Sequence, residues 1–250
     1  MNHTTNHARA VIEGTPCEGL VADDVFISTH GRRFDLASLT LCAPCTPTKI
    51  IGVGRNYADH IAEMKNVRTR EPLLFLKPPS ALNHPDGEIV YPELTHELHY
   101  EGELAVVIGR RCHSISEEEA DACIWGYTVC NDVTARDLQG SDHQWARAKG
   151  MDGFAPLGPW ITSGIDPADL RLRTYLNGEL KQEARTSSML YSVPALVAYA
   201  SAAFTLERGD VITTGTPSGV GPMQPGDVVE VEIEKIGVLR NRVVGHAPQR

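Results

Sequence analysis

Three acidic residues have types and spacing that suit a metal site. Glu101 and Glu103 are separated by a single residue, Gly102. They lie in the run 99–108, which is polar at its start and apolar at its end, as is typical of a β-strand. Because side chains alternate along a strand, the two carboxylates should point to the same face, about 7 Å apart. Asp132 follows a second apolar run, 123–130, where a buried strand should open into a loop. Strand ends of this kind often carry functional side chains.

The residues alone leave two interpretations of these carboxylates open. A Glu-x-Glu pair on one strand face is most often solvated. The apolar runs, however, predict that Asp132 is partly enclosed, and an enclosed cluster of three like charges is costly unless a cation neutralises it. Oxygen ligands alone favour a hard ion over zinc, and three carboxylates leave coordination positions open for water or substrate. We therefore expect Mg²⁺ or Mn²⁺, with Ca²⁺ as an alternative occupant in a crystal.

Five motifs resemble those of a known family. They occur in the family's order and are VGRNYADH at 53–60, LFLKP at 74–78, YEGEL at 100–104, NDVTARD at 131–137 and TGTPSGVG at 214–221. Together they resemble the fumarylacetoacetate hydrolase family over about residues 50 to 245. The resemblance implies the family's mixed β-roll, usually assembled as a homodimer, with Glu101, Glu103 and Asp132 as the metal ligands.

The resemblance also implies roles for residues outside the acidic cluster. His60 and Glu63 match a segment in which a histidine and a glutamate activate water or move a proton. On a helix they would share a face, although such a pair is also common on protein surfaces. Lys149 matches a lysine that touches the substrate. The remaining substrate-binding residues are expected to be Arg55, Lys77, Arg136, Gln139 and Thr216.

Three of these assignments have a plain structural alternative. Lys77 at the end of a short strand could equally be a solvated terminal lysine. The polar segment 137–150, which has no clean periodicity, could be an ordinary connector rather than part of the active-site rim. The Gly-rich run 214–221 lacks the lysine of a P-loop, so it is either a plain turn or a loop whose N–H groups close around a carboxylate.

Local signals predict the elements that must hold these residues. A strand is expected over about 49–53, followed by a helix over about 58–64 that Asn56 would cap. The pair Asn177-Gly178 predicts a hairpin with a type I′ turn. Ser116 with Glu119 forms a capping box, and Ser192 should cap a helix that runs to Phe204.

The pattern of elements predicts a β-rich α+β fold. Strands are many, helices are few and short, and the two do not alternate regularly. We expect residues 1–48 to form a small N-terminal segment and residues 49–250 to form the catalytic domain.

Composition excludes several classes of partner. A net charge of -9, the absence of a basic block and an aromatic content of only 6% argue against nucleic acid. No apolar run approaches the roughly 18 residues of a membrane span, and the polar start resembles no signal peptide, so the cytoplasm is the expected compartment. Cys42 and Cys45 have the spacing of a metal or redox pair but lack a second such pair, so the cysteines are expected to be reduced and mostly buried.

The chemistry that the resemblance implies is that of 2-oxo acids. A divalent ion would stabilise the enolate formed when a bond beyond C3 breaks or a proton shifts. Motifs at 127–132, 172–180 and 192–194 are most similar to the branch of the family that isomerises 2-hydroxyhepta-2,4-diene-1,7-dioate and decarboxylates 5-oxopent-3-ene-1,2,5-tricarboxylate in aromatic catabolism. The alternative is an acylpyruvate (fumarylpyruvate-type) hydrolase, in which His60 and Glu63 activate water. A silent ligand-binding protein is disfavoured because all three carboxylates are present.

Overall fold

One large mixed sheet runs through the molecule. The computed structural model describes residues 3–246. The sheet has twelve strands in the order β4-β3-β2-β1-β14-β12-β11-β17-β6-β7, with β5 on β1 and β8 on β14. They are β1 (Thr5–Ile12), β2 (Thr15–Ala22), β3 (Val25–Ser28), β4 (Arg33–Asp35), β5 (Thr40–Cys42), β6 (Ile50–Gly54), β7 (Leu73–Lys77), β8 (Leu82–Asn83), β11 (Gly102–Ile108), β12 (Ile124–Asn131), β14 (Ala155–Ser163) and β17 (Val211–Thr213).

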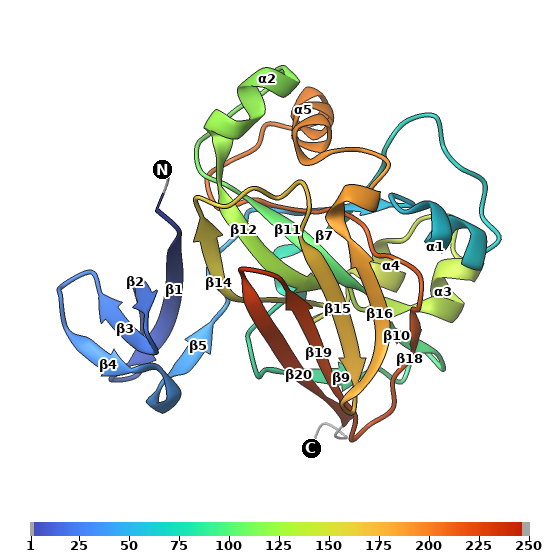
Figure 1. Cartoon of the computed structure of the whole chain (residues 1–250). Coiled ribbons are helices and arrows are strands. Elements are labelled where there is room, and N and C mark those ends of the chain that lie inside the picture. Colours follow the sequence, from blue (N-terminus) through green and yellow to red (C-terminus); the bar gives the residue numbers. More distant parts are fainter. Residues whose placement is uncertain (1–2, 247–250) are drawn as a thin grey trace.

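Two smaller sheets complete the β-structure. One has the order β13-β10-β18 and the other β16-β15-β19-β20-β9 (Figure 1). Their strands are β9 (Glu88–Tyr91), β10 (Leu98–Tyr100), β13 (Thr134–Ala135), β15 (Arg171–Leu176), β16 (Glu179–Arg185), β18 (Gly221–Pro222), β19 (Val228–Ile233) and β20 (Gly237–Gly245).

The helices are short and gather in two places. Figure 1 shows α2 beside α5 at the top of the fold, and α1, α3 and α4 together at one side. These α-helices are α1 (Ala58–Glu63), α2 (Glu117–Ala120), α3 (Arg136–Ser141), α4 (Ala146–Lys149) and α5 (Val193–Ala203). Short 3₁₀ turns are η1 (Leu36–Ser38), η2 (Pro79–Ala81), η3 (Asp121–Cys123) and η4 (Thr186–Ser188). The β-rich α+β prediction, with mixed sheets, is confirmed. No helix within residues 3–246 is long and apolar enough to cross a membrane.

The central strand β11 is buried on both faces. Leu104, Val106 and Ile108 pack into one apolar cluster, whereas Ala105 and Val107 pack into another on the opposite face. Strand alternation therefore places Glu103 on the same side as Ala105 and Val107. A carboxylate in this position cannot lie on a solvated edge, because the strand has core on both sides.

Several local predictions are confirmed. Asn177 and Gly178 have φ angles of 52° and 79°, as a type I′ turn between β15 and β16 requires. The capping box between Ser116 and Glu119 is present at α2. Ser192 caps α5 by accepting a hydrogen bond from the Ala195 N–H. The cysteines are free thiols, and five of the six are buried.

Other local predictions are wrong. Asn56 does not cap α1, which begins after Tyr57 without a side-chain cap. The Asn56 amide is instead buried and donates to the carbonyls of Thr214 and Tyr191, because these tertiary partners satisfy it better than a helix end. Of the two interpretations left open for the segment 137–150, the plain connector does not hold, since the segment contains most of α3 and all of α4.

The N-terminal segment contains more strand than its sequence suggested. Strands β1 and β2 pair over residues 6–21, although the start of the chain is polar. β1 also pairs with β14 through Thr5–His7, so the segment extends the main sheet while projecting to one side of it (Figure 1). The division of the chain at residue 48 remains a prediction.

Candidate metal centre

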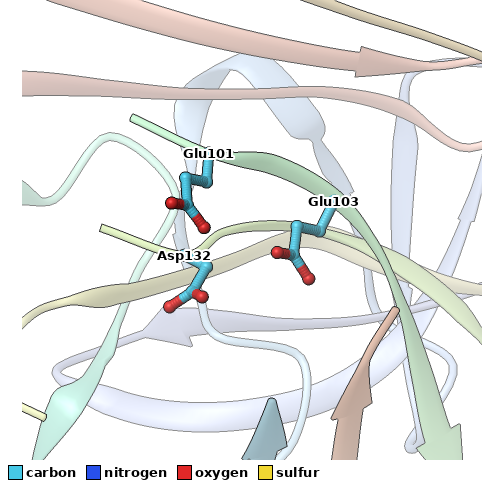
Figure 2. Close-up of side chains that lie close together, drawn as sticks. All are labelled: Glu101, Glu103 and Asp132. Carbon is cyan, nitrogen blue, oxygen red and sulfur yellow. The ribbon is translucent and has the colours of Figure 1, made fainter. Parts of the chain in front are cut away.

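The three carboxylates meet where two central strands end side by side. Glu101 precedes β11, Glu103 lies on it, and Asp132 follows β12, while Gly102 pairs with Asn131 across the two strands. The Asn131 side-chain oxygen accepts the Glu101 N–H at 3.0 Å, and the Asp132 N–H donates to the Glu101 carbonyl at 2.8 Å. These bonds fix the backbone so that the three side chains lie close together (Figure 2).

The donor set suits a hard divalent ion. Glu101, Glu103 and Asp132 are 4%, 1% and 1% exposed, and one oxygen of each lies within 4.8 Å of the others. Buried oxygen-only ligands of this kind favour Mg²⁺, Mn²⁺ or Ca²⁺. The chemistry and convergence of these residues therefore fit such an ion, and Asp132 is enclosed as the sequence predicted.

Three buried cations surround the carboxylates. The Lys149 ammonium donates to Glu101 Oε2 at 2.7 Å and to Asp132 Oδ2 at 2.6 Å. Lys77 pairs with Asp132 Oδ1, and Arg136 pairs with Glu101 Oε1. Lys77 is 0% exposed, so the interpretation of it as a solvated terminal lysine is wrong. Its strand ends inside the protein, against the carboxylates.

The cations divide the carboxylates into two electrostatic types. Burial acts to raise the pKa of Glu101, but the charges of Lys149, Arg136 and, more weakly, His60 outweigh it and hold that pKa well below its ordinary value. Among residues 3–246 no cation forms an ion pair with Glu103, so burial and then the charges of Asp132 and Glu101 raise its pKa. The charge of Lys149, and then the Gly215 N–H that donates to Glu103 at 2.7 Å, act to lower this pKa but do not offset the rise. Glu103 is therefore the carboxylate whose charged form an ion at this site would stabilise most.

Lys149 is held beside an aromatic wall. It ends the short helix α4 and is 2% exposed, with its ammonium 5.2 Å from the centre of the Phe75 ring. Burial acts to lower the pKa of Lys149, but the charges of Asp132 and Glu101 outweigh it and raise that pKa. Trp145 packs edge-on against Phe75 with ring centres 5.5 Å apart. The lysine is therefore a charged donor with one apolar side, inside the site.

The predicted proton-transfer pair also forms a contact. His60 and Glu63 lie on α1, and the distance from His60 Nδ1 to Glu63 Oε2 is 3.3 Å. The other oxygen of Glu63 accepts the Gly219 N–H at 2.9 Å. Glu63 thus joins the helix to the Gly-rich loop and orients the His60 ring, which is 8% exposed.

Three expected substrate contacts make protein contacts instead. The Arg55 guanidinium donates to Asn66 Oδ1 and to the Val67 carbonyl, in the loop after α1. Gln139 accepts from Arg136, and the Thr216 hydroxyl donates to the Gly102 carbonyl at 2.9 Å. A substrate-binding role for these residues remains a prediction.

The sequence interpretation missed polar residues that support the site. His99 accepts from Arg136 Nε through Nδ1 and contacts Glu97 through Nε2, which orients the guanidinium toward Glu101. The Gln182 side chain accepts a hydrogen bond from the Gly102 N–H and donates one to the Thr216 hydroxyl. No sequence signal pointed to Gln182, because the two-residue turn at Asn177-Gly178 would place it opposite Arg173. In the structure it pairs with Thr174, since the hairpin register shifts between Thr174 and Tyr175.

Comparison with known proteins then identifies the family. Residues 49–244 match the family model described as the fumarylacetoacetate (FAA) hydrolase C-terminal domain. The chain belongs to the fumarylacetoacetate hydrolase family. The resemblance found in the five motifs is therefore confirmed.

Similar proteins in this family have different activities. A solved structure of 5-carboxymethyl-2-hydroxymuconate delta-isomerase from Mycobacterium smegmatis is 44% identical, covers 97% of this chain and 99% of its own, and has a TM-score of 0.91. A fumarylacetoacetate hydrolase from Exiguobacterium antarcticum is 37% identical, with 97% and 100% covered and a TM-score of 0.89. The 4-hydroxyphenylacetate degradation bifunctional isomerase/decarboxylase of Salmonella dublin is 39% identical over 245 residues, which are 96% of this chain and 55% of that protein.

Proposed function

We propose that this protein is a divalent-metal-dependent decarboxylase/isomerase of unsaturated 2-oxo acids with two or three carboxylates, acting in aromatic catabolism. The observation that carries the proposal is the buried charge arrangement around Glu101, Glu103 and Asp132. The three cations Lys77, Arg136 and Lys149 equal the three carboxylates in number, but their ion pairs are with Glu101 and Asp132. A divalent ion would add two positive charges, which match the carboxylate and the enolate oxygen of a 2-oxo acid after bond cleavage.

Mg²⁺ or Mn²⁺ is the proposed ion, held by the three carboxylates. When bound, it supplies Lewis-acid stabilisation of negative charge that develops on the 2-oxygen. The ammonium of Lys149, which donates to Glu101 and Asp132 in this structure, would be a charged donor beside a substrate held at these carboxylates. Lys149 would then hold the 2-oxo acid end of the substrate and offset the charge of the enolate.

His60 is proposed to move the proton that both reactions need. In decarboxylation the bond to the leaving carboxylate breaks, carbon dioxide departs and a carbon of the enolate accepts a proton. In isomerisation a proton leaves one carbon and another is added farther along the conjugated chain. Glu63, 3.3 Å from His60 Nδ1, orients the ring for either transfer.

The second candidate is an acylpyruvate hydrolase. The His60–Glu63 pair favours it, because a carboxylate-oriented imidazole can also activate water. The similarity to the Exiguobacterium fumarylacetoacetate hydrolase supports a hydrolytic reaction. The two candidates share the metal site and differ in the bond that breaks.

A substrate panel tests the choice. Protein loaded with Mg²⁺ or Mn²⁺ would be incubated separately with the tricarboxylate, the heptadienedioate and an acylpyruvate, and the products assigned by mass. We expect carbon dioxide from the tricarboxylate and a shifted double bond in the dienoate. Fast acylpyruvate cleavage without either product would replace the proposal with the hydrolase.

A further inference from the structure

Gln182 is a buried amide at the back of the acidic cluster. It lies on β16 in the small five-stranded sheet and is 0% exposed. Its Oε1 accepts the Gly102 N–H at 3.0 Å, and its Nε2 donates to Thr216 Oγ1 at 2.8 Å and to the Pro217 carbonyl at 2.9 Å. Only one orientation of the amide meets a donor on one side and two acceptors on the other.

These bonds close a ring around Gly102. The Thr216 hydroxyl accepts from Gln182 and donates to the Gly102 carbonyl at 2.9 Å, so both polar backbone groups of Gly102 are held. Gly102 is the residue between Glu101 and Glu103. The ring therefore fixes the stretch of backbone that sets the relative position of two carboxylates.

The groups of this hydrogen-bonded ring lie so close to residue 102 that only a glycine fits there. A Cβ at Gly102 would lie 2.2 Å from Thr174 Oγ1 and 3.2 Å from Gln182 Oε1. Real Cβ atoms do not approach other atoms as closely as the first distance, so any side chain here would push the β15–β16 hairpin away. The glycine thus lets a strand of another sheet reach the backbone of the site.

We propose that Gln182 is a positioning residue of the metal centre, acting through the Gly102 peptide and Thr216 to hold Glu101 and Glu103 at the spacing that an ion requires. This inference rests on the proposed function, because it presumes an ion at these carboxylates. Groups that orient metal ligands from behind typically change metal affinity about 10- to 100-fold when removed.

The test measures Mn²⁺ affinity by the paramagnetic resonance of the free ion. Gln182→Met keeps the side-chain volume and removes all three hydrogen bonds, and Thr216→Val removes the other side of the ring. We expect each variant to bind Mn²⁺ about 10-fold or more weakly than wild type. Because both substitutions act on the same peptide, the double variant should lose little more than either single variant.

Thr174→Val is the matched control. Thr174 faces Gln182 across the hairpin and is 0% exposed, and its hydroxyl has no hydrogen-bond partner among residues 3–246. Its replacement disturbs the same packing without opening the ring, so Mn²⁺ affinity should stay at the wild-type value. If Gln182→Met does not fold, Thr216→Val compared with Thr174→Val gives the same answer.

The outcomes separate this inference from the proposed function. Wild-type Mn²⁺ affinity in Gln182→Met or, where that variant does not fold, in Thr216→Val would overturn the positioning role and leave the proposed function standing. Equal losses in Thr216→Val and Thr174→Val would show a packing effect and overturn it as well. A wild-type protein that binds no Mn²⁺ would overturn both proposals.

Discussion

At the scale of single residues, the site is a balance of buried charges. Lys149 touches two of the three carboxylates and Arg136 touches one, whereas Glu103 accepts a backbone N–H from Gly215. The spacing of the acidic residues predicted that their carboxylates would meet, but the single strand expected over 99–108 is wrong. The chain leaves one sheet after β10 and enters another at β11, and Glu101 lies between the two strands. The pairing with the cations could not be predicted, since it depends on where 77, 136 and 149 meet in three dimensions.

Lys149→Met should separate substrate binding from metal binding. Removing the ammonium takes away a positive charge that competes with the ion, so metal should bind at least as tightly as in wild type. The value of kcat/KM should fall by a factor on the order of 10² or more, because the enolate loses its charged donor. Metal content and kcat/KM would be measured together, with the exposed Lys235→Met as control. An unchanged kcat/KM would contradict the assigned role.

Glu103→Gln should change how stability depends on pH in metal-free protein. Folding raises the pKa of Glu103 above its ordinary value of about 4.5, so the folded state binds the proton more tightly than the unfolded state. Stability is therefore lost as pH rises from about 4.5 through the raised pKa, and this loss disappears in the Gln variant. We expect Glu103→Gln to unfold at a higher temperature than wild type near pH 8.

The difference in unfolding temperature should shrink as the pH falls toward 4.5, and thermal unfolding across this range would measure it. The exposed Glu93→Gln, whose side chain is 78% accessible, should show no such difference. A Glu103→Gln variant that is less stable than wild type at every pH would argue against an unbalanced charge at this position.

At the scale of elements, the turns and helix caps that depend on neighbouring residues were predicted correctly, whereas contacts between residues remote in the sequence were not. The turn at Asn177-Gly178 and the caps at Ser116 and Ser192 were predicted because neighbouring residues decide them. Asn56 was misassigned because its best partners, Thr214 and Tyr191, are remote in the sequence. The helix α4 was missed because its four residues are too few to show a period.

His60→Ala tests the role of α1 in the two candidate reactions. Acylpyruvate hydrolysis needs a base to activate water, so this variant should nearly abolish it. Loss of carbon dioxide needs no water, so that reaction should be slowed only in its proton delivery. Both rates would be measured on wild type and on the variant. Equal and complete loss of both would mean that His60 acts before the two pathways diverge.

At the scale of the whole molecule, no single segment contains the site. The carboxylates come from the middle of the large sheet, the cations from β7, α3 and α4, and the support behind them from β16 and the loop before β18. The fold class could be predicted because strand-rich patterning recurs along the chain. The hydrogen bond between the Gly102 N–H and the Gln182 side chain, which links β11 to the five-stranded sheet, could not be predicted, because Gln182 lies on a hairpin that is distant in the sequence. The homodimer that the family resemblance implies remains a prediction.

The central claim is that Glu101, Glu103 and Asp132 hold a divalent ion required for the reaction. The most direct measurement is metal content and activity in the same samples of wild type and Glu103→Ala, after chelator treatment and again after Mn²⁺ is restored. We predict one ion per wild-type chain, no activity without it and recovery with it. Glu103→Ala should neither retain metal nor recover. Full activity in chelator-treated wild type, or in Glu103→Ala, would contradict the account.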